Sequence, residues 1–191
     1  DEIVSIINKA GAALIGPNCI GVVTQSYNGV FTTPVPKLSS RGCDFVSGSG
    51  ATAVFIFESA IPKGLNFSSV YSVGNSAQTG VEEVLEYWDQ TYDPKISSHI
   101  KLIYVESIQN PDKLLLHASS LIRKGCRIAA IKAGTTEAGS RAASSHTGAL
   151  ASSDSAVEAL FRKAVIVRCS GREELTTVAS VFYHKILKDI G

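Results

Sequence analysis

The stretch IKLIYVESIQNPDKLLLHASSLIRKGCRIAAIK, residues 100–132, decides the fold that we expect for this chain. Its two ends, Ile100–Val105 and Arg127–Lys132, are short apolar runs of the kind that form buried strands. The segment between them begins with Asn110-Pro111, a good helix start, because asparagine caps a helix and proline fits its first turn. The stretch therefore predicts a strand, a helix and a second strand.

The same alternation of strands and helices extends to both sides of this stretch. Short apolar runs predict further strands at residues 44–46, 68–73 and 165–168. Apolar periodicity and capping residues predict helices at residues 51–60, 81–89, 110–124 and 154–164, and from the capping box at 170–173 to about residue 188. Such alternation favours an α/β fold with a parallel five-stranded sheet covered on both faces. Because crossovers are right-handed, the expected strand order is 2-1-3-4-5, as in a flavodoxin-like, doubly wound fold.

The first forty residues follow a different pattern. Residues 2–10 have the period of a helix, and Gly11 is placed as the glycine that ends it. Residues 12–15 predict a short strand. Residues 22–40, with their prolines and glycines among Ser and Thr, are interpreted as a linker with an extended piece near residues 30–33. A helix that opens the chain with no strand before it indicates the tail of a larger domain.

Composition and charge exclude several classes of function. The chain has 191 residues, 45% of them hydrophobic, which suits one domain with a small appendage. A net charge of +1 gives no electrostatic footprint for nucleic acid or an anionic membrane, and no apolar run approaches the length of a membrane span. The four cysteines are scattered, so neither a metal site nor a disulfide framework is expected. A reducing cytoplasm is the expected location.

Four segments rich in glycine, serine, asparagine or charge follow the predicted strands. In an open parallel sheet, ligands bind beyond the carboxyl ends of the strands, so these segments should meet at one edge. They are residues 47–51, 74–80, 106–110 and 132–148. We therefore expect the functional site at this edge.

Two of these segments each allow a functional and a structural interpretation. SGSG at residues 47–50 leads into a helix, whose N-terminal amides can bind phosphate without a basic side chain, or it is a strand-to-helix turn with a serine cap. Glu106 can accept the N–H of an imidazole and so fix its tautomer, or it is a surface glutamate. The residues alone leave both questions open.

His146 differs from the other histidines because its neighbours in AASSHTG, residues 142–148, are too small to pack around it. Small residues allow a close approach to a ligand, and a neutral imidazole can act as a nucleophile at cytoplasmic pH. The alternative is a flexible loop with an incidental histidine. A histidine nucleophile, an orienting carboxylate and a helix N-terminus together are what a transient phosphohistidine needs.

Four motifs carry a resemblance to a known family: GPNCIG at residues 16–21, SGSGA at 47–51, SVGN at 72–75 and SSHTG at 144–148. They resemble motifs of the nucleoside-diphosphate-forming acyl-CoA synthetases of the α-subunit type, relatives of the succinyl-CoA synthetase α subunit. By this resemblance, residues 1–37 are the tail of a Rossmann-type CoA-binding domain and a linker, and residues 38–191 are the flavodoxin-like ligase domain. Two departures are the missing aspartate in 76–80 and Val165, where glycine is usual.

The resemblance also implies roles for individual residues. His146 would be the phosphorylated histidine, with the Glu106 carboxylate beside it. Asn18 and Cys19 would lie where CoA or the acyl group approaches. The residues implied in phosphate binding are Ser49, Gly50, Ala51, Gly74, Asn75 and Gly148.

The reaction that the resemblance implies converts acyl-CoA, phosphate and ADP reversibly into a carboxylic acid, CoA and ATP. It passes through an acyl phosphate and then a phosphohistidine. The implied cofactors are CoA, phosphate and ATP/ADP with Mg²⁺, the nucleotide bound mainly by an ATP-grasp domain or β subunit. A small carboxylic acid substrate and an oligomer are also implied.

Two other classes of function remain open. One is a non-catalytic module that binds CoA or phosphate within a larger fusion protein, such as a CoA-regulated acyltransferase. The other is an FMN-binding flavodoxin, which lacks support because the loops carry no obvious aromatic pair to flank the flavin.

Overall fold

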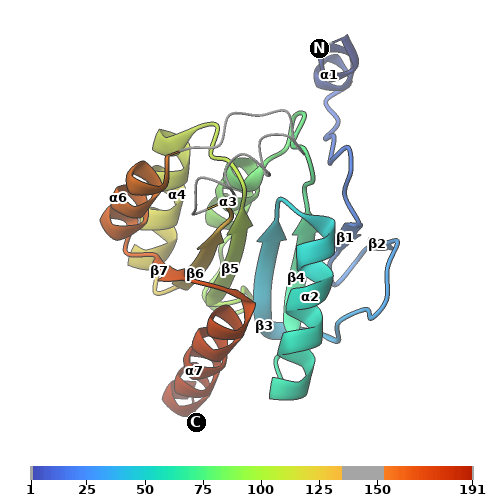
Figure 1. Cartoon of the computed structure of the whole chain (residues 1–191). Coiled ribbons are helices and arrows are strands. Elements are labelled where there is room, and N and C mark those ends of the chain that lie inside the picture. Colours follow the sequence, from blue (N-terminus) through green and yellow to red (C-terminus); the bar gives the residue numbers. More distant parts are fainter. Residues whose placement is uncertain (1, 135–152, 191) are drawn as a thin grey trace.

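The computed structural model of the chain describes residues 2–134 and 153–190, which form one sheet with helices on both faces (Figure 1). The sheet has seven strands in the order β2-β1-β4-β3-β5-β6-β7. Its parallel strands are β3 (Leu38–Ser47), β4 (Phe67–Ser72), β5 (Ile100–Val105), β6 (Arg127–Lys132) and β7 (Val167–Cys169). In chain order these five strands run 2-1-3-4-5, so the predicted flavodoxin-like order is confirmed.

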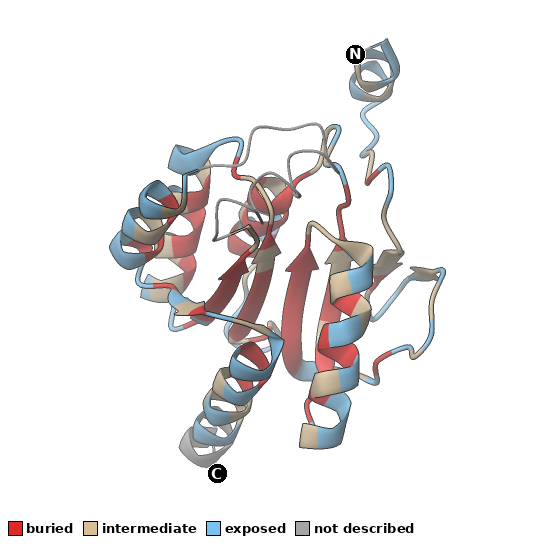
Figure 2. Cartoon of the chain, viewed as in Figure 1, coloured by how far each residue is buried: buried red, intermediate tan, exposed pale blue. Residues whose placement is uncertain are grey.

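The helices cover the sheet in two layers, each with its own apolar core. Buried residues of α3 (Val81–Gln90), α4 (Pro111–Arg123) and α6 (Asp154–Ala164) pack together in one cluster. Those of α2 (Gly50–Ala60) and α7 (Arg172–Ile190) form the other, and the short helix η1 (Ile61–Lys63) follows α2. Figure 2 shows the buried strands between these layers. The two cores cover both faces of the sheet and leave its edges free to carry the loops.

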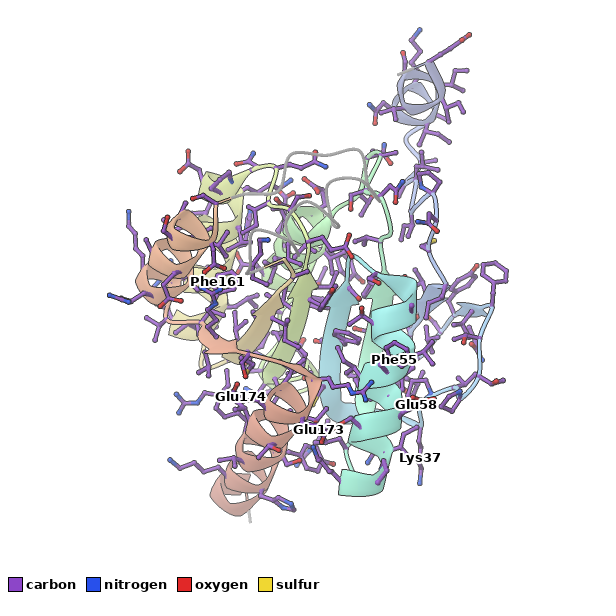
Figure 3. All side chains as sticks on the ribbon, viewed as in Figure 1. Lys37, Phe55, Glu58, Phe161, Glu173 and Glu174 are labelled. Atoms are coloured by element: carbon purple, nitrogen blue, oxygen red, sulfur yellow. The ribbon has the colours of Figure 1, made fainter. Side chains whose placement is uncertain are left out.

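α2 and α7 lie side by side on their face of the sheet (Figure 3). The Ser59 hydroxyl of α2 donates a hydrogen bond of 2.7 Å to the Glu173 carboxylate of α7. The guanidinium of Arg172 lies 5.2 Å from the centre of the Phe55 ring, a cation–π distance. These polar contacts at the start of α7 set its position against α2, the helix that opens at the predicted phosphate turn.

The carboxyl ends of four parallel strands meet at one edge of the sheet (Figure 1). Ser47 at the end of β3 is in register with Ser72 of β4 and Tyr104 of β5. Val105 at the end of β5 is in register with Lys132 of β6. The segments that follow these strands therefore leave the sheet at the same edge, as the sequence predicted.

The N-terminal region corrects two predictions. Residues 22–40 are only partly the predicted linker, because β1 (Gly21–Val23) and β2 (Asn28–Val30) form a hairpin whose first strand pairs antiparallel with β4, and β3 already begins at Leu38. Residues 12–15 are not a strand, and only Ile15 makes a single bridge, to Thr79. Strands of three residues carry too little periodicity to be recognised, and their pairing with β4 is a long-range contact.

The helix expected at residues 2–10 is confirmed as α1 (Glu2–Lys9). It has no buried residue and stands away from the sheet (Figure 1). The assignment of residues 1–37 to the tail of a CoA-binding domain stays a prediction. None of the helices that the structure describes is long and apolar enough to cross a membrane.

Candidate active site at the carboxyl edge of the sheet

The turn after β3 is held by its own serines. Ser49 is the N-cap of α2, and its side-chain oxygen accepts a hydrogen bond from the backbone N–H of Thr52 at 3.4 Å. The Ser47 hydroxyl donates to the carbonyl of Ser49 at 2.7 Å and accepts from its N–H at 3.2 Å. The predicted serine cap is therefore present, and it fixes the first turn of the helix.

The same turn leaves two backbone N–H groups open at the helix N-terminus. Those of Gly50 and Ala51 donate to no acceptor among the described residues. Open amides at a helix N-terminus carry partial positive charge and bind anions. Gly50 also has a packing reason to be glycine, because a Cβ there would lie 2.6 Å from Cγ2 of Ile20. A cap and an anion-binding end are therefore compatible in one turn.

The N-terminal segment at residues 16–20 forms a second wall of the site. Its carbonyls accept hydrogen bonds from the loop after β4: Pro17 from the N–H of Asn75 at 2.9 Å, and Gly16 from the N–H of Ala77 at 3.0 Å. The N–H of Ile20 donates to the Ser72 hydroxyl at 3.2 Å. These backbone contacts hold the GPNC segment against the edge of the sheet.

Backbone conformations that L-residues rarely adopt gather where the two segments meet. Asn18, Gly74 and Ser76 have φ values of 57°, 55° and 54°. A Cβ at Gly74 would lie 2.2 Å from the carbonyl oxygen of Pro17, so the close approach requires glycine. Such conformations persist only where surrounding contacts impose them, and they gather at functional sites.

Two adjoining pockets lie between these walls. The larger, of about 170 Å³, is lined by Asn18, Cys19, Ile20, Gly48, Ser49, Gly50, Ala51, Asn75 and Glu106. The smaller shares Gly48, Asn75 and Glu106 and continues along the loop after β5 to Ser107 and Gln109. Two residues with open amides, a glutamate and a cysteine therefore line one space.

Lys132 brings a cation to the same edge. It ends β6, is 2% exposed, and its ammonium donates a hydrogen bond to the carbonyl of Ala133. Burial lowers the pKa of Lys132, while the Asp154 and Glu106 carboxylates oppose this and Arg168 adds to it. Lys132 therefore lies at the edge where the site is, and its strongest opposing charge is that of Asp154.

The structure brings most of the sequence-predicted site residues together. Ser49, Gly50, Ala51, Asn18, Cys19, Asn75 and Glu106 line the larger pocket, and Gly74 lines the smaller one. His146 and Gly148 lie outside the described residues. Within the described ranges, no group of three or more potential ligand side chains could hold a metal ion.

Sequence reasoning missed Glu82, the most buried acidic residue near these pockets. It lies in the first turn of α3, is 3% exposed and lines the smaller pocket. Its Oε1 accepts hydrogen bonds from the backbone N–H groups of Gln109 at 2.7 Å and Asn110 at 3.0 Å. No periodic pattern marks Glu82, because its burial depends on a loop 27 residues away in the chain.

Comparisons with known proteins show the family to which the chain belongs. The family described as "Succinyl-CoA ligase like flavodoxin domain" matches residues 40–182. The chain is 34% identical over 176 residues, 91% of its length, to the ADP-forming acetate–CoA ligase I of Archaeoglobus fulgidus, and covers 25% of that protein. It is 33% identical over 189 residues, 98% of its length, to the α subunit of ADP-forming acetate–CoA ligase II of Pyrococcus furiosus, and covers 40% of it.

A solved structure has the same arrangement of elements. The chain resembles the acetyl-coenzyme A synthetase 1 of Ca. Korarchaeum cryptofilum in complex with phosphate and ADP, with a TM-score of 0.79 and 29% identity. The match covers 92% of this chain and 37% of that one. The chain thus spans well under half the length of each of these relatives. The family model matches most of the chain and the strand order is that of a flavodoxin-like sheet, so the chain belongs to the family of succinyl-CoA ligase-like flavodoxin domains.

Proposed function

We propose that this chain is the phosphohistidine-carrying part of an ADP-forming acyl-CoA synthetase. The observation that carries the proposal is the larger pocket, in which the open amides of Gly50 and Ala51 face the same space as Glu106 and Cys19. This arrangement suits a dianion that is held by fixed dipoles on one side and approached by reacting groups on the other. The names of the relatives as ADP-forming ligases support the same reaction.

In the first step, inorganic phosphate held by the turn attacks the thioester carbonyl of acyl-CoA. The C–S bond breaks, the CoA thiolate leaves and an acyl phosphate forms. Asn18 and Cys19 border the approach of the thioester, and Ser49, Gly50 and Ala51 hold the phosphoryl oxygens. Gly74, Asn75 and Gly148 complete the contacts to the phosphoryl group. Amide dipoles stabilise the added negative charge without a mobile cation.

In the second step, an imidazole nitrogen of His146 attacks phosphorus and the carboxylic acid product leaves as carboxylate. Glu106 accepts the N–H of the other ring nitrogen, which fixes the tautomer and leaves the attacking nitrogen unprotonated. The phosphoryl group then passes to ADP on an ATP-grasp domain or β subunit, where Mg²⁺ would neutralise phosphate charge. The name of the Pyrococcus relative, a subunit alpha, supports a separate nucleotide-binding partner.

We also propose that the acid is small and that the protein works in the cytoplasm as an oligomer with this partner. All four cysteines are free thiols, which suits a reducing compartment. The acyl pocket takes part of its lining from the partner and from the complete CoA-binding domain.

The proposal is tested by labelling the full-length protein, with its ATP-grasp partner, with radioactive ATP and Mg²⁺. We expect an acid-labile, alkali-stable phosphate on the parent protein and none on His146→Asn. Labelling that persists in the variant would exclude His146 as the carrier. Binding of CoA and phosphate with no labelling of the parent would instead favour the non-catalytic binding module.

A further inference from the structure

Glu82 is buried, although its carboxylate binds backbone N–H groups of a loop that lies at the surface. Glu82 is 3% exposed, whereas Gln109 and Asn110, whose backbone N–H groups its carboxylate binds, are exposed. Water could satisfy the amides of an exposed loop, and a buried carboxylate is unfavourable unless it is hydrogen-bonded. The two hydrogen bonds offset the burial of the carboxylate and tie the loop to α3. The contact fixes the position of the loop.

The loop that Glu82 holds begins at Glu106. Val105 anchors the N-terminal side of this loop in β5, and the amides of Gln109 and Asn110 anchor its other side on Glu82. Ile108 between them is 8% exposed and packs in the core. A loop of five residues held at both sides and in the middle has little freedom, so Glu106 is held in place at the pocket.

The hydrogen bonds of Glu82 are of the strong kind. Both are charge-assisted bonds to a carboxylate in a low-dielectric setting, and both go to the same oxygen, Oε1. The carboxylate sits in the first turn of α3, where the helix dipole favours negative charge. Glu82 is thus itself fixed by α3, which packs against α4 in the core.

We infer that Glu82 is a positioning residue, which holds the Glu106 carboxylate in its catalytic place through the backbone of residues 106–110. This inference rests on the proposed function, because it assigns Glu106 a part in the phosphoryl transfer. Glu82 itself touches no substrate in this mechanism. Glu82 acts on the rate by fixing the geometry of Glu106. Its loss should therefore lower kcat and leave KM, which reflects substrate binding, nearly unchanged.

The neighbouring Glu83 supplies a matched control. It lies on the same turn of α3, but its carboxylate binds the N–H of Gly80 at 2.8 Å and the ammonium of Lys113 at 3.0 Å, and it makes no contact with the amides of Gln109 and Asn110. Glu83→Ala therefore removes a carboxylate and two hydrogen bonds near the loop without releasing the loop. Glu82→Gln removes the charge and replaces the second oxygen with an NH2 group, but it keeps one oxygen that can accept both hydrogen bonds.

The experiment measures kcat and KM of the full-length enzyme, with its ATP-grasp partner, for the parent, Glu82→Ala, Glu82→Gln and Glu83→Ala. We expect Glu82→Ala to lower kcat about 10- to 100-fold, the effect of a displacement near 1 Å at a reacting group, with KM nearly unchanged. Glu82→Gln should recover most of the rate, and Glu83→Ala should keep it. Hydrogen exchange at the amides of Gln109 and Asn110 should accelerate in Glu82→Ala alone.

Several results would overturn the inference. Parental kcat in Glu82→Ala, or an equal loss in Glu83→Ala, would show that the contact does not position the reacting group. Failure of Glu82→Gln to recover the rate would show that the acceptor geometry is not what matters. A parent enzyme that takes up no phosphate contradicts the proposed function instead, so the two failures are distinguishable. If Glu82→Ala does not fold, Glu82→Asp takes its place, because the shorter side chain draws the acceptor away from the two amides. It should lower kcat and accelerate exchange of both amides, and parental values of both would overturn the inference.

Discussion

The backbone N–H of Asn75 donates a hydrogen bond of 2.9 Å to the carbonyl oxygen of Pro17. The two residues are far apart in the chain. Pro17 precedes Asn18 and Asn75 follows Gly74, and both Asn18 and Gly74 have positive φ. The side chains of Asn18 and Asn75 also meet, at 3.3 Å. The contact joins the N-terminal segment to the loop after β4. Residues of both segments, among them Asn18 and Asn75, form one side of the larger pocket.

The closeness of these two backbones predicts a large effect of Gly74→Ala. Positive φ by itself costs an L-residue about 1–2 kcal/mol, and overlap of the new Cβ with the carbonyl of Pro17, 2.2 Å away, adds about 1–3 kcal/mol. Gly64→Ala is the matched control, because Gly64 has φ of 72° and open space around its Cβ position. Urea unfolding should show the larger loss for Gly74→Ala, and equal losses would contradict the close approach.

Ser49 allows the helix cap and the anion site to be separated. Ser49→Ala removes the N-cap and should lower the free energy of unfolding by about 1 kcal/mol. Ser49→Asp keeps a capping oxygen and suits the helix dipole, but it places a negative charge in the pocket. We expect its stability to match the parent and its affinity for inorganic phosphate, measured by calorimetry, to fall. Ser49→Asn is the control, because it caps the helix without adding charge. Equal phosphate affinity of Ser49→Asp and Ser49→Asn would argue against an anion site.

The parallel core was predictable because its strands are local apolar runs with polar ends. The boundaries of β5 and β6 match the predicted ranges, and the two strands end in register at the predicted edge of the sheet. The hairpin β1–β2 was not predictable, because Val22 and Val23 alone do not make a pattern and the pairing with β4 is set by the fold. The burial of Glu82 has the same origin, since an amphipathic reading of α3 treats an acidic residue as solvent-facing.

Val165 confirms the strain expected where glycine is usual. It is the C-cap of α6 with φ of 61° and ψ of 34°, a left-handed conformation that a β-branched residue adopts at a cost. Its side chain is 66% exposed, so little burial is lost on its removal. Val165→Gly should raise the free energy of unfolding by about 1 kcal/mol, after the greater flexibility of unfolded glycine is subtracted. Val165→Ala keeps positive φ on an L-residue, so it should not raise the free energy of unfolding. An equal gain in both variants would show that the backbone conformation is not its cause.

Glu83 predicts part of the acid sensitivity of the fold. Burial alone would raise its pKa, but hydrogen bonds from the Gly80 N–H and from Lys113 outweigh burial and hold the pKa of Glu83 below its usual 4.5. A carboxylate with a lowered pKa in the fold stabilises above its unfolded pKa, and this stabilisation is lost as the pH falls through the folded pKa. The difference in unfolding free energy between the parent and Glu83→Gln should therefore shrink between about pH 7 and about pH 3. A constant difference would contradict the lowered pKa.

Asp44 of β3 and Lys101 of β5 form an ion pair near the start of β5, away from the carboxyl ends of the strands where the proposed site lies. Both residues are almost fully buried, at 6% and 1% exposure. Asp44 also accepts from the Ser69 hydroxyl at 2.6 Å, and Lys101 donates to the carbonyl of Ser98 at 2.9 Å. Lys101→Met leaves the carboxylate buried without its cation, so the free energy of unfolding should fall by about 3–5 kcal/mol.

The cost of Lys101→Met should come from the stranded carboxylate and not from the missing cation alone. Adding Asp44→Asn removes that charge and keeps an acceptor for Ser69, so the double variant should be more stable than Lys101→Met, with a coupling of at least about 1 kcal/mol. Arg162→Met is the control, because the Arg162 side chain is 80% exposed in its ion pair with Glu158, and screening by water leaves such a pair little effect. If the double variant loses the sum of the unfolding free energies that Asp44→Asn and Lys101→Met lose singly in urea, the two charges do not stabilise each other. Two buried charges that act independently gain nothing from being adjacent.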